Sequence, residues 1–281
     1  MNYLHVFHAG NFADVFKHMV LLALLRKFRS KEKGFSYVET HAGRGLYDLQ
    51  GEPASRTGEA LKGVLKLADD DGGSEDIRAY LDVVAALPGN EQGMRWYPGS
   101  PLIARAMMRE QDRAILAELH PEEAAALKAN LRSDTRFSVH CRDGWEALKG
   151  LLPPMPRRGL LLVDPPFEDE DEFEAIFRGL DEVEDRWPNA CIAVWYPIKR
   201  SADLDPVYRR LSKGKYGAVL RAELCLHPDD TPASLNGTGV FVIRPPWQLD
   251  EDIRRWLPEL GPRLLGKPAF RTRVDWLSTP E

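Results

Sequence analysis

The chain has 281 residues, of which 43% are hydrophobic and 29% are charged. This balance is typical of a globular protein and excludes a disordered chain, a collagen and a disulfide scaffold. Its 38 Lys and Arg residues against 43 Asp and Glu residues give a net charge of −5, which excludes a nucleic-acid binder that is basic over its whole surface. The charge is uneven, because residues 1–34, 199–221 and 253–273 carry +4, +5 and +5, whereas residues 164–186 carry −9. Three basic segments on an acidic chain indicate a surface suited to a polyanion, with solvated helix faces as the alternative.

The three cysteines, Cys141, Cys191 and Cys225, are isolated from one another and lie in apolar surroundings. We therefore expect three buried thiols, as in a reducing compartment, and neither a zinc site nor a disulfide framework. The longest apolar run, Met19–Leu25, is too short to span a bilayer, and the N-terminus has no signal-peptide pattern. These features predict a cytoplasmic protein without membrane contact, and nothing in the sequence indicates an oligomer.

The first helix is predicted to begin near Asn11, a residue type that caps helices well. Apolar residues then recur with helical spacing at Val15, Phe16, Met19, Leu22 and Ala23. The preceding residues 3–10 are rich in His and aromatic side chains without a clear period, so we expect an ordered arm. A short strand is predicted next, over Phe35–Glu39.

Residues from about 52 to 95 have the pattern of a small helical subdomain inserted after this strand. One amphipathic helix is marked by Ala60, Leu61, Val64, Leu65 and Ala68, and another by Ile77, Tyr80, Leu81 and Val84. Ser74 is predicted to cap the second of these helices. A further helix is expected from the run Tyr97-Pro98-Gly99-Ser100-Pro101 to about Glu110.

From there, strand and helix patterns alternate along the chain. Strands are predicted over Ala114–Glu118, Phe137–His140, Gly159–Val163, Cys191–Tyr196, Val219–Leu226 and Gly239–Ile243, and helices over Pro121–Leu131 and Gly144–Leu151. Nearly continuous apolar strands that alternate with helices indicate a parallel sheet covered on both faces. We therefore predict one α/β domain over residues 1–281, a Rossmann-like doubly wound sheet with its ligand at the carboxyl ends of the strands.

Polar residues follow each of the first three predicted strands. The glycines of His41-Ala42-Gly43-Arg44-Gly45 allow a tight turn that brings backbone N–H groups close to a ligand, although such turns also occur as plain structure. Glu118 is placed to accept both hydroxyls of a ribose, with a solvated acid at a helix start as the alternative. Asp143 and Gly144 suit the edge of an adenine, or else form a simple N-cap.

The strongest signal follows the fourth strand, at Asp164-Pro165-Pro166-Phe167. Two prolines fix φ at successive positions and hold the backbone in an extended kink whose carbonyls are free to accept hydrogen bonds. Asp164 and the Pro165 carbonyl would accept the two N–H bonds of an amino-bearing planar base, and Phe167 would stack on its ring. The alternative is a loop that merely ends at two prolines, as at Pro245-Pro246-Trp247.

At these residues the chain resembles a known family. The Asp164–Phe167 run resembles the Asp/Asn/Ser-Pro-Pro-Tyr/Phe motif of amino methyltransferases, and the chain from Tyr3 to the region of Trp276 resembles the RlmJ family of 23S rRNA adenine-N6 methyltransferases. The motifs that carry the resemblance as a set are His8-Ala9-Gly10-Asn11, Ala13-Asp14-Val15, Lys17-His18, Thr40-His41-Ala42-Gly43, Arg56-Thr57-Gly58-Glu59, Tyr97-Pro98-Gly99-Ser100-Pro101, Glu118-Leu119-His120-Pro121 and Trp195-Tyr196-Pro197. Phe167 departs from the Tyr that is usual in the family, which retains the ring and loses the hydroxyl.

The resemblance implies a class I methyltransferase fold that uses S-adenosyl-L-methionine. By position it implies cofactor contacts at His18, His41, Ser100, Glu118, Asp143 and Gly144, and a catalytic role for Asp164 together with Pro165 and Phe167. The implied reaction methylates the exocyclic N6 of a specific adenine in 23S rRNA, either protein-free or in an early precursor. The target base must leave its stack to reach such a site.

When Asp164 and the Pro165 carbonyl accept the two N–H bonds, the adenine amino group would be drawn toward a tetrahedral shape, with its lone pair directed at the methyl group. Most of the catalysis would therefore be positioning. Asp164 would also stabilise the transient positive charge on the methylated amine. We expect Tyr3 and His5 to close over the base and Lys17 to bind substrate. The basic arm and segment 199–221, with Lys199 and Arg200, would bind phosphates.

Three alternatives differ in class. A methyltransferase that acts on DNA adenine would share the same motifs, and a non-catalytic RNA-binding assembly protein would keep a vestigial cofactor fold. A dehydrogenase would need a complete dinucleotide fingerprint, which the chain lacks, and the absence of a P-loop Lys-Ser/Thr disfavours a nucleoside triphosphate. His5, His8, His18 and His41 do not have metal-ligand spacing with any acid, so no metal is expected.

Overall fold

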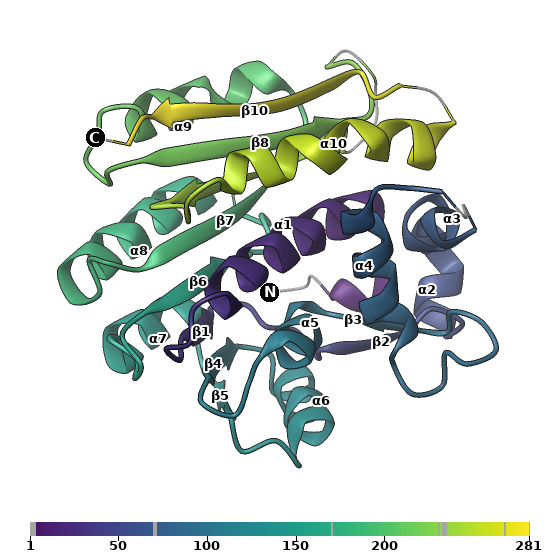
Figure 1. The fold of residues 1–281 in the computed structure, drawn as a ribbon, viewed down its shortest axis with the longest axis horizontal. Helices are drawn as coiled ribbons and strands as arrows, with labels where there is room; N and C mark the ends of the chain where they lie inside the picture. The colour runs from purple at the N-terminus through teal and green to yellow at the C-terminus, as the bar shows by residue number, and fades with distance from the viewer. Residues whose placement is uncertain are drawn as a thin grey trace.

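The computed structural model describes residues 4–69, 72–169, 171–229, 231, 235–266 and 268–280. Its centre is an eight-stranded mixed sheet with the order β10-β8-β9-β7-β6-β1-β4-β5 (Figure 1). Five adjacent strands are parallel to one another, namely β1 (Ser36–Glu39), β4 (Arg113–Glu118), β5 (Phe137–Cys141), β6 (Gly159–Val163) and β7 (Cys191–Ile198). With the first strand central and the chain winding outward on both sides, this half of the sheet has the predicted Rossmann-like order.

The other half of the sheet differs from the prediction of a parallel sheet. Strand β9 (Gly237–Ile243) runs antiparallel to β7, β8 (Val219–Cys225) runs antiparallel to β9, and β10 (Arg271–Ser278) runs antiparallel to β8. β10 has no counterpart among the predicted strands, because it contains few apolar residues and so lacks the apolar run by which the other strands were predicted. This composition fits its position at the edge of the sheet. Continuous apolar character identified the strands but carried no information about their direction.

Helices cover both faces of this sheet (Figure 1). One apolar core joins the sheet to α1 (Phe12–Arg29), α5 (Ser100–Met107), α6 (Pro121–Leu131) and α10 (Leu249–Leu265). A second core on the opposite face joins it to α7 (Gly144–Leu151), α8 (Glu172–Arg186) and α9 (Asp205–Leu211), with the short η3 (Ser201–Leu204) before α9. Within the described residues, no helix combines the length and apolar character needed to cross a membrane.

Helix α1 begins where the sequence predicted it. The side chain of Asn11 accepts a hydrogen bond from the N–H of Asp14 at 2.9 Å, which caps the first turn. Nearly every residue of the first two thirds of α1 is buried, including the polar Asp14, Lys17 and His18. A polar face this deeply buried needs partners elsewhere in the fold.

A helical segment lies between β2 (Leu46–Asp48) and β3 (Trp96–Pro98), which pair antiparallel with each other. It contains α2 (Glu52–Thr57), η2 (Glu59–Lys62), α3 (Val64–Ala68) and α4 (Glu75–Ala85). The single helix predicted over residues 60–68 is wrong, because the chain breaks at Gly63. A side chain there would clash with the carbonyl of Gly10, so the segment packs closely against the start of α1 only by interrupting the helix.

Two smaller expectations are met only in part. Cys141 is exposed, whereas Cys191 and Cys225 are buried, because Cys141 ends the edge strand β5. Ser74 occupies the N-cap position of α4 as predicted, but its side chain makes no capping bond and its hydroxyl oxygen is buried without a partner in the described chain. In the arm, residues His5–Phe7 form one 3₁₀ turn, η1.

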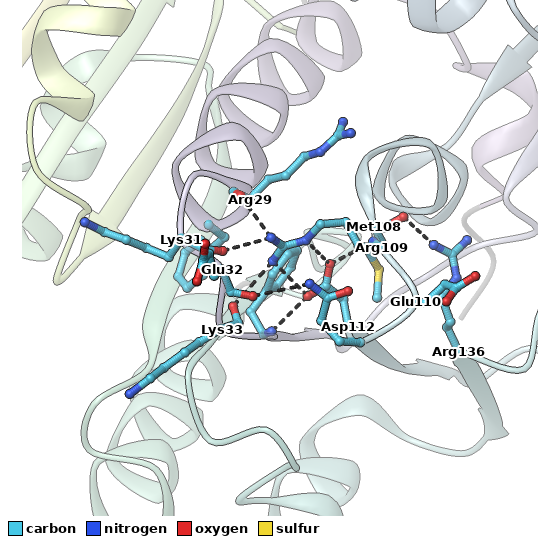
Figure 2. Close-up of polar contacts among 12 residues, drawn as sticks. Arg29, Lys31, Glu32, Lys33, Met108, Arg109, Glu110, Asp112 and Arg136 are labelled. Carbon is cyan, nitrogen blue, oxygen red and sulfur yellow. Dashed lines mark hydrogen bonds and ion pairs between the residues drawn. The ribbon is translucent and has the colours of Figure 1, made fainter.

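The turn between α1 and β1 is held by arginine side chains (Figure 2). Arg109 donates from Nη1 to the carbonyls of Arg29 and Lys31, at 3.1 and 2.8 Å, and from Nη2 to that of Lys33 at 3.4 Å. Asp112, which is fully buried, orients Arg109 and accepts the N–H of Phe35 at 3.0 Å. These bonds fix the start of β1, and the far end of that strand carries site residues.

We expect Asp112→Ala to lower the free energy of unfolding by about 3 kcal/mol, because it leaves buried N–H groups and the Arg109 guanidinium without their acceptor. Urea denaturation measures this change. Glu110→Ala is the matched control, since it removes an exposed carboxylate from the same turn and should change stability by no more than about 0.5 kcal/mol. An equal loss in the two variants would contradict this role of Asp112.

Candidate active site

A cavity of about 680 Å³ lies at the carboxyl ends of β1, β4 and β6, beside the first half of α1. Most of the predicted site residues line it, namely His5, Lys17, His18, His41, Ser100, Glu118, Asp164 and Pro165. Asp143, Gly144 and Phe167 are not among the lining residues, and Tyr3 lies outside the described residues. The volume is in the range of small-molecule sites.

A buried ion group forms the floor of the cavity. The ammonium of Lys17 lies 2.6 Å from Oδ2 of Asp164 and 2.9 Å from Oδ1 of Asp14. Burial alone would lower the pKa of Lys17, but these two carboxylates hold it well above its usual value. Lys17 is only 5% exposed, so its first role in this structure is to pair with Asp164. The sequence placed Lys17 near the substrate but gave no sign of this pairing.

Asp14 completes the group from the other side. Its Oδ2 accepts from Nε2 of His5 at 2.8 Å and from the backbone N–H of Gly10 at 2.9 Å. Burial opposes ionisation here, yet the charges of His5 and Lys17 keep the pKa of Asp14 well below its usual value. The arm is thereby attached to the first turn of α1, with His5 at the wall of the cavity.

The two prolines place Asp164 and direct the aromatic residue that follows them. Phe167 has φ of +51°, a left-handed conformation that is unusual for a bulky residue. Its ring packs edge-on against Phe173 and Trp195, with centroids 5.2 and 5.7 Å apart. Trp195 itself lines the cavity, and its Nε1 donates to Oγ1 of Thr238 at 2.7 Å. The aromatic side chain that lines the cavity here is therefore Trp195 and not Phe167; the sequence marked Trp195 only as part of a family motif, without a role.

Two neutral histidines form part of the cavity wall. His18 bonds through Nδ1 to the hydroxyl of Tyr97 at 2.8 Å, and burial lowers its pKa to about 3. His41 bonds through Nδ1 to Oγ1 of Thr40 at 2.8 Å, and burial lowers its pKa to about 4. Both rings are uncharged at neutral pH, so this wall does not repel a cationic ligand.

Glu118 presents an ordered carboxylate at the end of β4. Its oxygens accept from the N–H of Gly43 at 2.8 Å and from that of His120 at 2.7 Å, while burial raises its pKa. Asp143 caps α7 by accepting the N–H groups of Trp145 and Glu146 at Oδ1. The N-cap alternative is thus observed for Asp143, with Oδ2 accepting no hydrogen bond from the described residues.

Glycine is required at position 144, because a side chain there would clash with the carbonyl of Thr40 at the end of β1. Gly144 therefore brings the start of α7 against the β1 turn. The four histidines considered for a metal have different partners: His5 bonds Asp14, His8 bonds Glu59, His18 bonds Tyr97 and His41 bonds Thr40. The described residues contain no group of three or more side chains that could hold a metal ion.

Glu39 is a buried acid that sequence reasoning missed. It ends β1, is 1% exposed, and accepts from the hydroxyl of Tyr37 at 2.8 Å and from the hydroxyl of Ser100. Burial raises the pKa of Glu39 to about 8. A polar residue at the last position of a buried strand was the available signal, because in such sheets this position faces the ligand site.

The raised pKa of Glu39 predicts a pH dependence of folding. Between about pH 4.5 and pH 8 the folded chain keeps the proton that the unfolded chain has released, so stability falls as the pH rises through this window. We expect Glu39→Gln to remove that contribution, which is at most about 1.4 kcal/mol per pH unit. Denaturation midpoints between about pH 6 and pH 8 test it, with Glu52→Gln, an exposed acid, as control. Parallel stability curves for wild type and Glu39→Gln would refute it.

Comparisons with known proteins agree with the resemblance found in the sequence. The family model described as "Ribosomal RNA large subunit methyltransferase D, RlmJ" matches residues 32–278. The chain is 37% identical, over the whole of both chains, to "Ribosomal RNA large subunit methyltransferase J" of Haemophilus influenzae, and 38% identical, over 99% of each chain, to the protein of that name from Escherichia coli. A crystal structure of a Legionella pneumophila protein matches with a TM-score of 0.86 at 31% identity, covering 95% of this chain and 98% of that one. Matches of this extent show that the chain belongs to the RlmJ family of ribosomal RNA large subunit methyltransferases.

Proposed function

We propose that this protein transfers a methyl group from S-adenosyl-L-methionine to the exocyclic N6 of a specific adenine in 23S rRNA. The observation that carries the proposal is the position of Asp164 and Pro165 at the end of β6, where they line a cavity beside Lys17. Membership of the RlmJ family supports ribosomal RNA as the substrate. An rRNA substrate also favours a cytoplasmic location. The match of one family model to residues 32–278 supports a single methyltransferase domain over residues 1–281.

The residues of the cavity fit a cationic cofactor. S-adenosyl-L-methionine, when bound, supplies a methyl group attached to a positively charged sulfur. His18, His41, Ser100 and Glu118 would hold it from the wall, and Asp143 and Gly144 would contribute from the adjoining start of α7. His18 and His41 are neutral, and the single ammonium of the floor faces two carboxylates, so the floor and this wall present no net positive charge to the cofactor.

Asp164 would hold the amino group of the target adenine. Lys17 occupies its Oδ2, which leaves Oδ1 to accept one N–H of the base while the Pro165 carbonyl accepts the other. The amino nitrogen would form a bond to the methyl carbon as the bond between that carbon and the sulfonium sulfur breaks, which leaves a neutral thioether. The carboxylate would stabilise the positive charge on nitrogen until one N–H proton is released to water. Pairing with Lys17 orients Asp164 for this step, so much of the effect is positioning.

The surroundings suit a base that has left its stack. Trp195 offers an aromatic face in the cavity, with Phe167 packed behind it. His5 would close over the base from the arm together with Tyr3. Lys199 and Arg200, both exposed after β7, would contact phosphates. Arg200 pairs with Asp203 at 3.1 Å, but both side chains are largely exposed and such pairs are weak.

The central prediction concerns Asp164. We expect protein-free 23S rRNA to accept label from S-adenosyl-L-methionine as N6-methyladenine, and Asp164→Asn to lower kcat at least about 100-fold because a strong acceptor is lost at the reacting nitrogen. Asp169→Asn, an exposed change in the same loop, should retain wild-type activity. Transfer to DNA alone would favour the DNA alternative, and RNA binding without transfer by the wild type would favour an assembly protein.

A second prediction concerns the charge of Lys17. In Lys17→Met, loss of the ammonium raises the pKa of Asp14, which holds His5 and the floor of the cavity in place, so the acid limb of the kcat profile should move to higher pH. Lys17→Arg retains a positive charge and should keep the limb near its wild-type position. Circular dichroism verifies folding, since an unpaired buried Asp14 lowers stability by about 3–5 kcal/mol. An unmoved acid limb in folded Lys17→Met would contradict this role.

A further inference from the structure

Two lysines from the helical segment between β2 and β3 lie at the rim of the cavity. Lys62 ends η2 and Lys66 lies in α3, and both line the cavity while their side chains are exposed. Two partly exposed leucines line another part of the cavity, Leu235 from the β8–β9 connection and Leu265 from the end of α10. The entrance therefore has a cationic side and an apolar side.

The positive charge of this rim is not neutralised within the described chain. Glu59 lies one turn before Lys62 and would be its natural helical partner. Its Oε1 instead accepts from Nδ1 of His8 at 2.8 Å and its Oε2 from Nδ2 of Asn11 at 2.9 Å. No ion pair of Lys62 or Lys66 with another described residue is present.

The lysines are held at a defined place relative to the ion group of the floor. The N–H of Val64 donates to the carbonyl of Gly10 at 2.8 Å, directly between the two lysines in sequence, and the break at Gly63 permits this contact. Gly10 also donates its N–H to Asp14, the partner of Lys17. A short chain of bonds thus connects the cationic rim to the cavity floor.

The local charge contrasts with that of the segment as a whole. Residues 52–95 contain five Lys and Arg against nine Asp and Glu, yet residues 56–66 contain three of those five bases and only Glu59 among the acids. Basic side chains are therefore concentrated on the part of an acidic segment that reaches the cavity. Such a concentration of basic side chains is suited to a polyanion.

We propose that Lys62 and Lys66 bind phosphates of the RNA nucleotides that flank the target base. This inference rests on the proposed function, since it names contacts of the same substrate outside the pocket that takes the base. Phosphate contacts set the register of a nucleic acid on a protein, and exposed lysines serve well as point charges for them. The helical segment would then be an RNA-binding element of the enzyme.

The test compares RNA affinity at several salt concentrations. Equilibrium binding of the full-length protein to a protein-free 23S rRNA transcript is measured over a series of KCl concentrations for wild type, Lys62→Ala/Lys66→Ala and Lys62→Arg/Lys66→Arg. Each lost phosphate contact makes the negative slope of log K against log salt shallower by about 0.7, so the slope of the alanine variant should be shallower by about 1.4 and that of the arginine variant should resemble wild type. The affinity for S-adenosyl-L-methionine should stay unchanged.

The matched control is Lys128→Ala/Lys149→Ala. These two lysines are also exposed, but they lie on α6 and α7 and do not line the cavity. This control should keep the wild-type salt slope. A wild-type slope in Lys62→Ala/Lys66→Ala would overturn the inference, as would weakened cofactor binding with unchanged RNA binding, which would assign the lysines to the cofactor carboxylate. If the wild-type protein does not methylate RNA, the proposed function itself is refuted. This outcome is seen without any variant and is therefore distinct from a failure of the inference about Lys62 and Lys66.

Discussion

The site depends on the buried ammonium of Lys17 between the carboxylates of Asp14 and Asp164. Removing such charges from water costs several kcal/mol per ion, which is offset only when each partner is held in place. Asp14 is held by the N–H of Gly10 and by His5, and Asp164 follows directly from a central strand of the sheet. Because Lys17 and Asp164 are 147 residues apart in the chain, their contact fixes the first helix against the end of β6 and closes the floor of the cavity.

Charge varies systematically from the floor of this cavity to its rim. Two carboxylates surround one ammonium at the floor, and the histidines of the wall are uncharged because burial lowers their pKa. Lys62 and Lys66 are exposed at the rim. An interior without net positive charge suits a cationic methyl donor, and a cationic entrance suits a phosphate backbone, so the two proposed ligands are attracted to different depths of one cavity.

The parallel half of the sheet and the additions to it have different parts in this arrangement. Strands β1, β4 and β6 end at the cavity and carry the acids Glu39, Glu118 and Asp164 at or just after their last residues. The helical segment between β2 and β3 contributes Lys62 and Lys66 to the entrance, and the connection between the antiparallel strands β8 and β9 contributes Leu235. The parallel strands thus position the chemical groups, whereas the additions shape access to them.

The sequence by itself determined the elements whose signals are local. β6, α6 and α7 have the predicted bounds. A glycine begins β6, a proline begins α6 and a capping acid precedes α7, and the Asp164-Pro165 sequence that follows β6 is likewise a local signal. Only the tertiary structure decided the pairing of Lys17 with Asp164, the burial of Glu39, the helix break at Gly63 and the direction of β8, β9 and β10. Each of these depends on atoms contributed by segments far apart in the chain, and neither residue spacing nor local propensity contains that information.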